Sequence, residues 1–365
     1  MKKMTVVGLL LVLMTVLLLS EVGVAQAGQK LITVNTAWMP EYELFFAWYA
    51  KQKGWDKEEG LDMKLLNFDS GMAIAEALPA KQWVLGATGG VPMVVTNLRY
   101  GAYLIGIAVD DSFGNAIFVR PNSQVMKSKG AQKGYPNIYG TAADIKGKTF
   151  LVTTVSSVHF AMSSYLKAFG LKDSDVIIKQ MDQASAVAAF DSGIGDFVCL
   201  WAPYTYTAAD KGWKEIANIN TAKAGLPVTF IADKDFADKN PEVVAKFLRV
   251  MYRSVNKLKE EGATPQNIQL FQQMYKDFAG MEYSADQAKR DIQIHPIYTL
   301  AEQLKMFDTS KGESEVQRWE RLVAEFLHAN GRLDDAELAK VESNHMSWIT
   351  GKYLKMVQTP IPAYK

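Results

Sequence analysis

The chain has 365 residues, of which 48% are hydrophobic, so it can bury a large core but exceeds the roughly 100 to 200 residues of one typical domain. Lys and Arg total 40 against 39 for Asp and Glu, which gives a formal net charge of +1. Such a balance provides no overall electrostatic field that would favour nucleic acid or an acidic membrane as a partner. We therefore expect two lobes and a small-molecule ligand.

The N-terminal segment predicts export. Lys2 and Lys3 precede an apolar run at 6–19 and then Ala25-Gln26-Ala27, a pattern typical of a secretory signal peptide over residues 1–27 that is cleaved near Ala27. A retained anchor helix is the alternative, but about 14 apolar residues fall short of the roughly 20 that span a bilayer. No cysteine follows the apolar run, so we expect a free periplasmic protein without a lipid anchor.

After Gly28, short β-rich runs alternate with amphipathic helical patterns, which is typical of an α/β protein with mainly parallel sheets. Hydrophobic spacing and cap residues predict helices over 42–53 and 72–78 and another from Pro92. The strands predicted for a first lobe are 31–36, 63–68, 83–87, 103–108 and 116–120.

A polar stretch at 121–142 contains Gly and Pro and predicts a surface loop near the crossover to a second lobe. Strands at 148–153, 175–180 and 197–201 then alternate with helices at 157–169 and 184–191.

The chain is expected to return near Gly225 through a strand at 228–232 and to be almost wholly helical afterwards, with helices starting at Pro241 and Pro265. The predicted domains are lobe 1, comprising 28–120 plus 226–365, and lobe 2, comprising 121–225, with a ligand cleft between the lobes and crossings near Arg120 and Gly225.

Ligand-binding candidates gather in loops that join a strand end to a helix start. These loops are Asp69-Ser70-Gly71, Gly89-Gly90-Val91-Pro92 and the run from Thr154 to His159, which includes Ser156 and Ser157. Free backbone N–H groups and the positive end of the helix dipole make a helix start an anion site, and small or hydroxyl residues let a ligand approach. The alternative is that these residues are ordinary caps.

Aromatic and acidic residues cluster after the first strand, where Trp38 and Glu41 could enclose the other end of a ligand and pair with an amine. Glu41 and Glu43 could equally favour only the first turn of the helix. A second acidic pair, Asp110-Asp111, follows a strand and either faces the cleft or caps a turn.

The run TTVSSVHFAMSSYLKAFG at 153–170, with Leu200-Trp201-Ala202-Pro203 downstream, resembles the taurine and aliphatic-sulfonate binding proteins, which are related to nitrate and thiamine-precursor binders. Phe68-Asp69-Ser70-Gly71, Gly114-Asn115 and 235–244 are also similar, so that the resemblance covers about 32–257. It implies a two-lobed periplasmic binding protein type II fold with a helical C-terminal extension. Such a monomer closes around its ligand and is presented to the permease and ATPase of an ABC transporter.

The positions that match the ligand-facing residues of this family are Glu41, Asp69, Ser70, Gly89, Gly90, Asn115, Ser156, Ser157, His159 and Trp201. Two departures bear on the ligand. Gly89-Gly90-Val91 replaces a Gly-Ser-Ser loop and removes hydroxyl donors, and 226–229 lacks the acidic residue that taurine binders carry after the second crossing. A sulfonate therefore remains the expected ligand class, while taurine itself is left open.

The residues argue against catalysis and cofactors. Cys199 is the only cysteine, which excludes an intramolecular disulfide and the cysteine-rich motif of same-fold pyrimidine-forming enzymes. Ser157 and His159 lie two apart on a helix and point in different directions, and no metal-ligand spacing or nucleotide-binding glycine motif is present. We expect no enzyme, metal or cofactor; a carrier for an aromatic carboxylate, nitrate-like or pyrimidine ligand is the alternative function.

Overall fold

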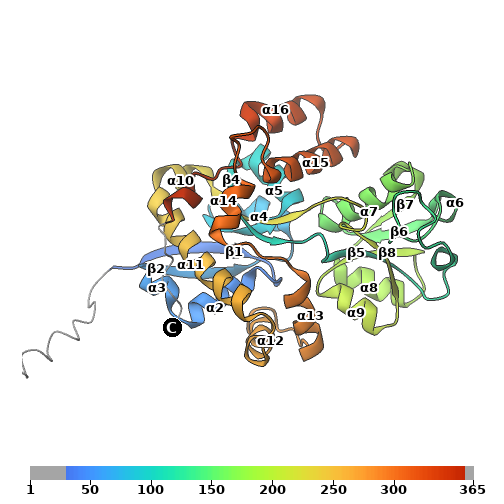
Figure 1. Cartoon of the computed structure of the whole chain (residues 1–365), viewed down its shortest axis with the longest axis horizontal. Coiled ribbons are helices and arrows are strands. Elements are labelled where there is room, and N and C mark those ends of the chain that lie inside the picture. Colours follow the sequence, from blue (N-terminus) through green and yellow to red (C-terminus); the bar gives the residue numbers. More distant parts are fainter. Residues whose placement is uncertain (1–29, 358–365) are drawn as a thin grey trace, which may run out of the picture.

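The computed structural model describes residues 30–357, so the predicted signal peptide at 1–27 lies outside the described residues. The chain forms two five-stranded sheets with strand orders β2-β1-β3-β10-β4 and β7-β6-β8-β5-β9. Each sheet carries its own helices, and Figure 1 shows the two halves side by side. We call the half built on the first sheet lobe 1 and the other half lobe 2. Within 30–357, no helix has the length and apolarity needed to cross a membrane.

The sheet of lobe 1 combines parallel and antiparallel strands. β1 runs parallel to β2 and β3, whereas β10 is antiparallel to β3 and β4. All seven residues of β10 are buried, as expected for a strand that lies inside a sheet covered on both faces. The bounds are β1 (Ile32–Trp38), β2 (Leu61–Asn67), β3 (Leu85–Gly89), β4 (Ala102–Asp110) and β10 (Pro227–Asp233).

The strand predicted at 116–120 belongs to lobe 2, so its assignment to the first sheet was wrong. β5 pairs with β8 and β9, and the Arg120 side chain donates hydrogen bonds to the carbonyls of Phe190 and Gly195 at 2.6 and 2.7 Å. Hydrophobic alternation identifies a strand but not its partner. The bounds in lobe 2 are β5 (Asn115–Val119), β6 (Thr149–Val152), β7 (Ile177–Gln180), β8 (Phe197–Trp201) and β9 (Lys214–Asn218).

The chain therefore first crosses between the lobes at 111–114 rather than near Arg120, and it returns between Asn218 and Pro227. The two crossings lie against each other, because Asp111 N donates to Leu226 O at 2.9 Å. The stretch at 121–142 follows a strand of lobe 2 and lies at the outer end of that lobe rather than near the crossover (Figure 1).

Local cap chemistry explains many helix starts. α11 and α12 begin at Pro241 and Pro265 as predicted, and the Thr264 hydroxyl accepts a hydrogen bond from Asn267 N. The Asn240 side chain instead donates to Phe236 O of the preceding helix. The helices of lobe 1 before the second crossing are α2 (Leu44–Gln52), α3 (Trp55–Glu58), α4 (Gly71–Ala77) and α5 (Gly90–Tyr100), and those of lobe 2 are α6 (Ala142–Ile145), α7 (Ser157–Ala168), α8 (Gln183–Asp191) and α9 (Tyr204–Asp210).

The C-terminal region adds helices to lobe 1, and these also touch lobe 2. They are α10 (Lys234–Lys239), α11 (Pro241–Glu261), α12 (Pro265–Ala279), α13 (Ala285–Ile294), α14 (Leu300–Met306), α15 (Glu315–Ala329), α16 (Asp335–Met346) and α17 (Lys352–Met356). On one side of the molecule α15 packs on α5 of lobe 1 and α7 of lobe 2, and on the other side α13 lies near α9 (Figure 1).

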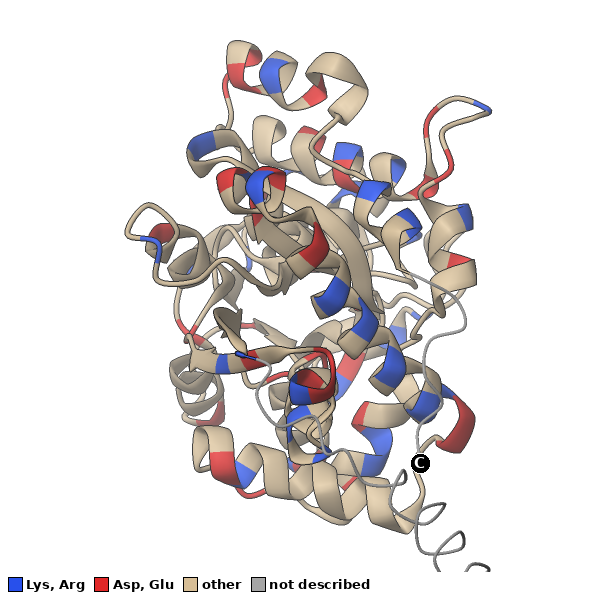
Figure 2. Cartoon of the chain, turned by 90° about the vertical axis from the view of Figure 1, so that its left-hand side faces the viewer, with Lys and Arg blue, Asp and Glu red and all other residues tan. Residues whose placement is uncertain are grey.

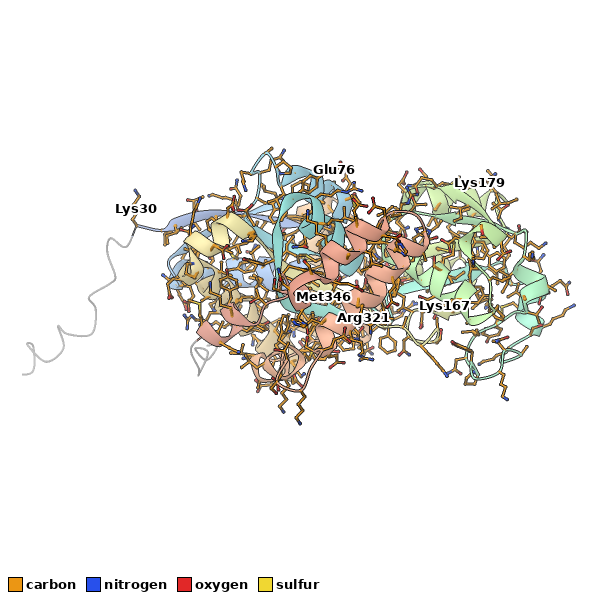
Figure 3. The ribbon with its side chains drawn as sticks, turned by 90° about the horizontal axis from the view of Figure 1, so that it is seen from above. Lys30, Glu76, Lys167, Lys179, Arg321 and Met346 are labelled. Carbon is orange, nitrogen blue, oxygen red and sulfur yellow. The ribbon has the colours of Figure 1, made fainter. Side chains whose placement is uncertain are left out.

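The contacts at these two places differ in chemistry. The Phe326 ring of α15 packs on His159 and Phe160 of α7 at centroid distances of 5.1 and 5.4 Å. On α13, Gln287 Nε2 donates to Asp210 of α9 at 2.8 Å, and Arg290 lies 3.4 Å from the same carboxylate. Seen from above, the helix bearing Arg321 lies beside the lobe that carries Lys167 (Figure 3).

Charged residues of both signs alternate along the ribbon of lobe 1 that faces the viewer in Figure 2, in keeping with the formal net charge of +1. Several of these charges pair with each other, as in Arg249 with Glu59 at 2.9 Å.

Replacing Phe326 with Ala should loosen the lobes, because its ring fills the contact between α15 and α7. We expect the unfolding free energy to fall by about 3 kcal/mol and the radius of gyration, measured by small-angle X-ray scattering, to increase. Phe247→Ala is the control: this ring packs beside Trp38 and Phe230 inside lobe 1 and should lower stability without separating the lobes. An unchanged radius in the Phe326 variant would contradict the prediction.

Candidate ligand-binding site

A cavity of about 180 Å³ lies between the two lobes. Elements from both lobes and the first crossing form its wall, and Asp111 of that crossing is among the residues that line it. The volume is below the roughly 300 Å³ at which sites for drug-sized ligands begin. The cavity therefore suits a compound of few heavy atoms. Seven of the predicted site residues line it: Glu41, Ser70, Gly89, Asn115, Ser156, Ser157 and Trp201.

Three helix starts meet at this cavity. α4 begins after Ser70, α5 after Gly89 and α7 after Ser156, and each of these cap residues lines the wall. The Ser70 hydroxyl accepts from Ala73 N at 3.1 Å, and the Ser156 hydroxyl donates to Thr153 O and accepts from His159 N. The ordinary capping role that the sequence left open is therefore present for both serines. Ser157 Oγ makes no hydrogen bond to any residue within 30–357, so it is available to a ligand.

Glycine at position 89 lets the lobes approach closely. A Cβ placed on Gly89 would lie 2.9 Å from Ser157 Oγ of the opposite lobe, and a Cβ on Gly71 would lie 2.4 Å from the Pro92 ring. A side chain at either position would collide with a neighbouring helix start. The absence of side chains here keeps the starts of α4, α5 and α7 close enough to share one small ligand.

An acidic cluster surrounds His295 at the hinge side of the cavity. His295 Nε2 lies 3.3 Å from Asp111 Oδ1, and Nδ1 lies 2.9 Å from Asp291 Oδ1. The imidazole also stacks on Tyr42 at a centroid distance of 5.3 Å, and Asn115 Nδ2 donates to the Asp111 carboxylate. Despite these carboxylates, residues 30–357 contain no group of three or more His, Cys, Asp or Glu side chains placed to hold a metal ion.

Burial is the largest influence on the pKa values of the two glutamates in this cluster. It raises the pKa of Glu43 to about 8, with nearby Asp111 adding to the effect, and it raises the pKa of Glu41 well above its usual value, with Glu43 and Asp111 adding. Burial alone would lower the pKa of His295, but hydrogen bonds to Asp111 and Asp291 outweigh it and raise that pKa. The two neighbouring carboxyl groups therefore favour the protonated form of the buried imidazole, while burial raises the pKa of Asp111 itself.

Five predicted site residues lie outside the wall of the cavity. Trp38 is wholly buried, with Nε1 bonded to Thr36 Oγ1 at 2.7 Å, so it cannot enclose a ligand. Asp69 is exposed to solvent, and Gly90 faces the buried Glu320 carboxyl rather than the cavity. Asp110 accepts from Ser112 N at 3.0 Å and so caps the turn, which was the alternative for this acidic pair.

His159 is the fifth predicted site residue that lies outside the wall of the cavity. Its Nε2 lies 2.7 Å from Asp173 Oδ2, and its Nδ1 accepts from Val155 N at 3.2 Å. Val155 has a φ of 55°, a conformation that is strained for a β-branched residue, and it lines the cavity. His159 thus holds the loop before α7 in shape, and neither ring nitrogen faces Ser157.

Sequence reasoning missed several residues of the wall. Among them, Met39, Met72 and Val228 are apolar, whereas Asp111 and Gln180 are polar. Gln180 ends β7, a strand parallel to β6, and accepts from Thr154 N at 2.6 Å. Its place at the end of a predicted strand was a usable signal, since ligands bind where parallel strands end. For Asp111 the signal was the acidic pair itself, from which the sequence analysis selected Asp110, whereas Asp111 lines the cavity.

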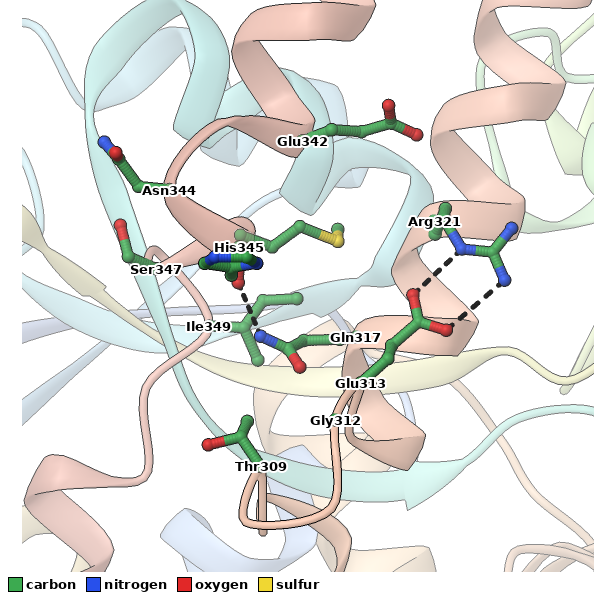
Figure 4. A pocket seen from close by; sticks show the side chains of 11 residues that line it. Thr309, Gly312, Glu313, Gln317, Arg321, Glu342, Asn344, His345, Ser347 and Ile349 are labelled. Carbon is green, nitrogen blue, oxygen red and sulfur yellow. Dashed lines mark hydrogen bonds and ion pairs between the residues drawn. The ribbon is translucent and has the colours of Figure 1, made fainter.

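A second cavity of about 740 Å³ lies among the C-terminal helices, away from the lobe interface (Figure 4). Two of its ionic groups pair with each other, since Arg321 Nε donates to Glu313 Oε1 at 2.9 Å. Gln317 Nε2 donates to the His345 carbonyl at 2.6 Å across its wall. We place the candidate site between the lobes, because the cap residues of α4, α5 and α7 all line that smaller cavity.

The buried carboxyl groups should make stability depend on pH. In the folded chain burial raises the pKa of Glu43 to about 8, whereas in the unfolded chain this carboxyl has its ordinary pKa of 4.5. The unfolded state therefore binds fewer protons in this window, so the unfolding free energy should fall as pH rises from about 5 to 8. Each unit by which the pKa of a group differs between the folded and the unfolded chain changes the unfolding free energy by about 1.4 kcal/mol. Urea denaturation at several pH values measures this slope of the unfolding free energy against pH.

Glu43→Gln should flatten this slope, and Glu76→Gln, at an exposed side chain, controls for the substitution itself. Glu41, Asp111, Asp291 and His295 surround Glu43 and will retain part of the slope. Stability that rises between pH 5 and 8 would contradict the assignment of a protonated Glu43.

Comparisons with known proteins agree with this architecture. A putative ABC transporter periplasmic binding protein from Brachyspira hyodysenteriae is 24% identical over 88% of this chain and 90% of its own length. The taurine-binding periplasmic protein of Escherichia coli is 26% identical, and the match covers 53% of this chain and 56% of that relative. A putative aliphatic sulfonates-binding protein from Bacillus subtilis is 28% identical, over 56% and 60% of the two chains.

Solved structures show the same fold. The aliphatic sulphonate binding protein SsuA of Escherichia coli superimposes with a TM-score of 0.63 at 19% identity, covering 84% of this chain and 91% of that chain. The nitrate-binding protein NrtA of Synechocystis gives a TM-score of 0.63 at 14% identity, covering 91% of each chain. The family model described as NMT1/THI5 like matches residues 43–263. The chain therefore has the periplasmic binding protein fold and belongs to the NMT1/THI5-like family.

Proposed function

We propose that this protein is the exported solute-binding component of an ABC importer that captures a small organic anion or zwitterion, most favourably a sulfonate, and delivers it to the membrane permease. Relatives described as ABC transporter, taurine and aliphatic-sulfonate binding proteins support this assignment. The observation that carries it is the small cavity where three helix starts meet.

The helix starts supply the anion site. At the start of α5 and α7, backbone N–H groups lack partners within the helix, and the helix dipole adds partial positive charge. None of the residues that line the cavity within 30–357 is Lys, Arg or His. An anion must therefore be bound by amides and hydroxyls, which suits the three oxygens of a sulfonate because several donors approach from different directions.

The remaining wall is suited to a short organic chain. Met39, Met72 and Val228 provide apolar contacts, and Trp201, at the end of β8, offers an aromatic surface. Val228 lies on the strand after the second crossing, where taurine binders carry an acidic residue. An amine on the ligand would therefore need an acceptor elsewhere in this cavity.

Closure around the ligand follows from the two-lobe construction. The cavity wall draws on both lobes, so a bound ligand contacts both only when they are together. Ligand binding then shifts the population toward the closed form, in proportion to its differential affinity for the two forms. The closed form is the one that the permease would recognise.

A carrier for an aromatic carboxylate, nitrate or a pyrimidine is the second candidate, because Trp201 could stack on a ring. Catalysis has less support. Ser157 has no base beside it, since both nitrogens of His159 are engaged by Asp173 and Val155 N.

Isothermal titration calorimetry on the protein from Gly28 onward tests the proposal. The panel holds short alkanesulfonates, carboxylates of equal length, nitrate and an aminopyrimidine. We expect a sulfonate to bind more tightly than the carboxylate of equal length. Binding of only the aminopyrimidine or nitrate would transfer the assignment to the second candidate, and loss of the bound compound to a product would indicate an enzyme.

Ser157→Ala tests the anion site. Its hydroxyl has no partner within 30–357 and lines the cavity, so its loss should weaken sulfonate binding about tenfold, the usual effect of a hydrogen bond to a charged group. Thermal stability should be unchanged. Ser156→Ala is the matched control: it removes the cap of α7 and should cost about 1 kcal/mol of stability with a smaller effect on affinity. Equal affinity in wild type and the Ser157 variant would contradict the role of this helix start.

A further inference from the structure

Helix α15 carries a buried carboxyl group without a hydrogen-bond partner. The Glu320 side chain is wholly buried, and neither Oε1 nor Oε2 accepts a hydrogen bond from any residue within 30–357. Two other glutamates close to it in sequence, Glu313 and Glu325, differ because both pair with Arg321 at the surface. An unpaired carboxyl in the interior of a protein is unfavourable. Glu320 therefore lowers stability, and its presence suggests a role in function.

Glu320 lies against the start of α5, the helix whose cap residue lines the cavity. A Cβ placed on Gly90, the first residue of α5, would lie 2.9 Å from Glu320 Oε1. A Cβ on the preceding residue, Gly89, would instead lie 2.9 Å from Ser157 Oγ, which lines the cavity. The Cα atoms of consecutive residues are about 3.8 Å apart. The carboxyl and the cavity thus adjoin neighbouring residues of one helix start.

The packing of α15 keeps the carboxyl in this place. Val316, Val323 and Leu327 are buried and share the face of Glu320 at helical spacing, so the carboxyl stands in the apolar stripe of the helix. Trp319 packs so closely on the second crossing that a Cβ on Gly225 would lie 2.7 Å from its Nε1. Glu320 therefore cannot turn to solvent while α15 remains in contact with lobe 1.

The surroundings of Glu320 favour its neutral form. Burial raises the pKa of this carboxyl well above its ordinary value of 4.5, and burial is the cause of the shift. Charged groups on the elements around α15 have other places or partners. They are Arg99 in the last turn of α5, His159 of α7 with Asp173, Lys340 of α16 with Leu98 O, Asp111 of the first crossing with His295, and Lys223 of the second crossing over the Tyr135 ring.

An anion in the cavity and a charge on Glu320 would act on the same helix start. The dipole of α5 favours a negative charge there, but two negative charges close together repel each other, and the interior screens them less than water does. Pro92, the third residue of α5, has no N–H, so this helix start has fewer free amides than most. The ligand and an ionised Glu320 would therefore compete for few donors.

We propose that Glu320 controls the affinity of the cavity for an anion through its charge: the neutral carboxyl leaves the start of α5 to the ligand, and the ionised carboxyl opposes a second negative charge there, so that anion binding takes up a proton at Glu320. This inference rests on the proposed function, because it concerns the anion that this helix start would bind. Glu320 does not line the cavity, so it is a positioning residue that acts through α5.

The direction of the pH dependence follows from the sign of the charge. As pH rises through the pKa of Glu320, the carboxyl becomes negative, and the affinity for an anion falls. By linkage, a bound anion increases the affinity of Glu320 for its proton by the same factor. The protein therefore holds its ligand more tightly at acidic than at alkaline pH.

Isothermal titration calorimetry with propane-1-sulfonate tests the inference, because the charge of a sulfonate does not change over the pH range used. We expect the affinity of the wild-type protein to fall about tenfold from about pH 6 to about pH 9, as for two charges that interact in the interior. Repeating each titration in buffers of different ionisation enthalpy counts the protons that binding takes up. A role of Glu320 in folding alone would alter thermal stability without altering this count.

Neutral replacements assign the effect to Glu320. Glu320→Gln should bind as the wild type does at acidic pH and keep that affinity at alkaline pH, with a smaller proton uptake. Glu320→Met, also neutral and of similar size, replaces it if the glutamine variant fails to fold. Glu315→Gln is the matched control, since this exposed carboxyl on the same helix should leave the wild-type profile unchanged.

The possible outcomes separate this inference from the proposed function. A wild-type affinity that does not change with pH would overturn the role of Glu320 and leave the sulfonate carrier standing. A pH profile and proton uptake that persist in the neutral variants would also overturn it, and would transfer the proton to Glu41 or Asp111, which line the cavity. Propane-1-sulfonate that fails to bind at every pH would overturn both proposals.

Discussion

The buried ion pair of His295 with Asp111 at the first crossing determines how the lobes meet, and the cavity depends on that meeting. Asp111 cannot turn away without leaving a charged imidazole unpaired in the interior, which is strongly unfavourable. Gly114 allows the chain to pass directly against the pair. Because Asn115 of β5 is bonded to the same carboxylate, the start of the second sheet is tied to the hinge. This bond is thus one of the contacts that hold lobe 2 against lobe 1, together with the packing of α15 on α7.

The two ends of the cavity complement each other in charge without any basic side chain. Helix starts contribute N–H groups to the wall, and Glu41, Asp111 and Asn115 contribute oxygen atoms. An arginine would bind an anion more strongly, but it would also neutralise the acidic wall in a space of about 180 Å³. Amide donors avoid this because they carry only partial charge.

Sequence reasoning located the helix starts because capping serines and glycines are local signals. Ser70, Gly89, Ser156 and Ser157 line the cavity as the loops indicated. It failed where the outcome depends on which way a side chain points or which sheet a strand joins. Trp38 ends β1 with its ring in the core, bonded to Thr36, and the strand at 116–120 pairs in the other lobe. The spacing of hydrophobic residues predicts neither the direction of the Trp38 side chain nor the sheet that this strand joins, because both depend on packing between segments that are distant in sequence.

The C-terminal helices, about which the sequence said little, affect the energy of opening. Phe326 of α15 packs on α7 at one rim, and Arg290 and Gln287 of α13 contact Asp210 at another. These contacts join lobe 2 to lobe 1, and none of their residues lines the cavity, so they do not depend on a bound ligand. Affinity scales with the fraction of protein that is competent to bind. A protein that spends most of its time closed would also prevent its ligand from entering the cavity. The exposed, polar contact at Asp210 is the weaker of the two in water, and the lobes should separate first at that rim.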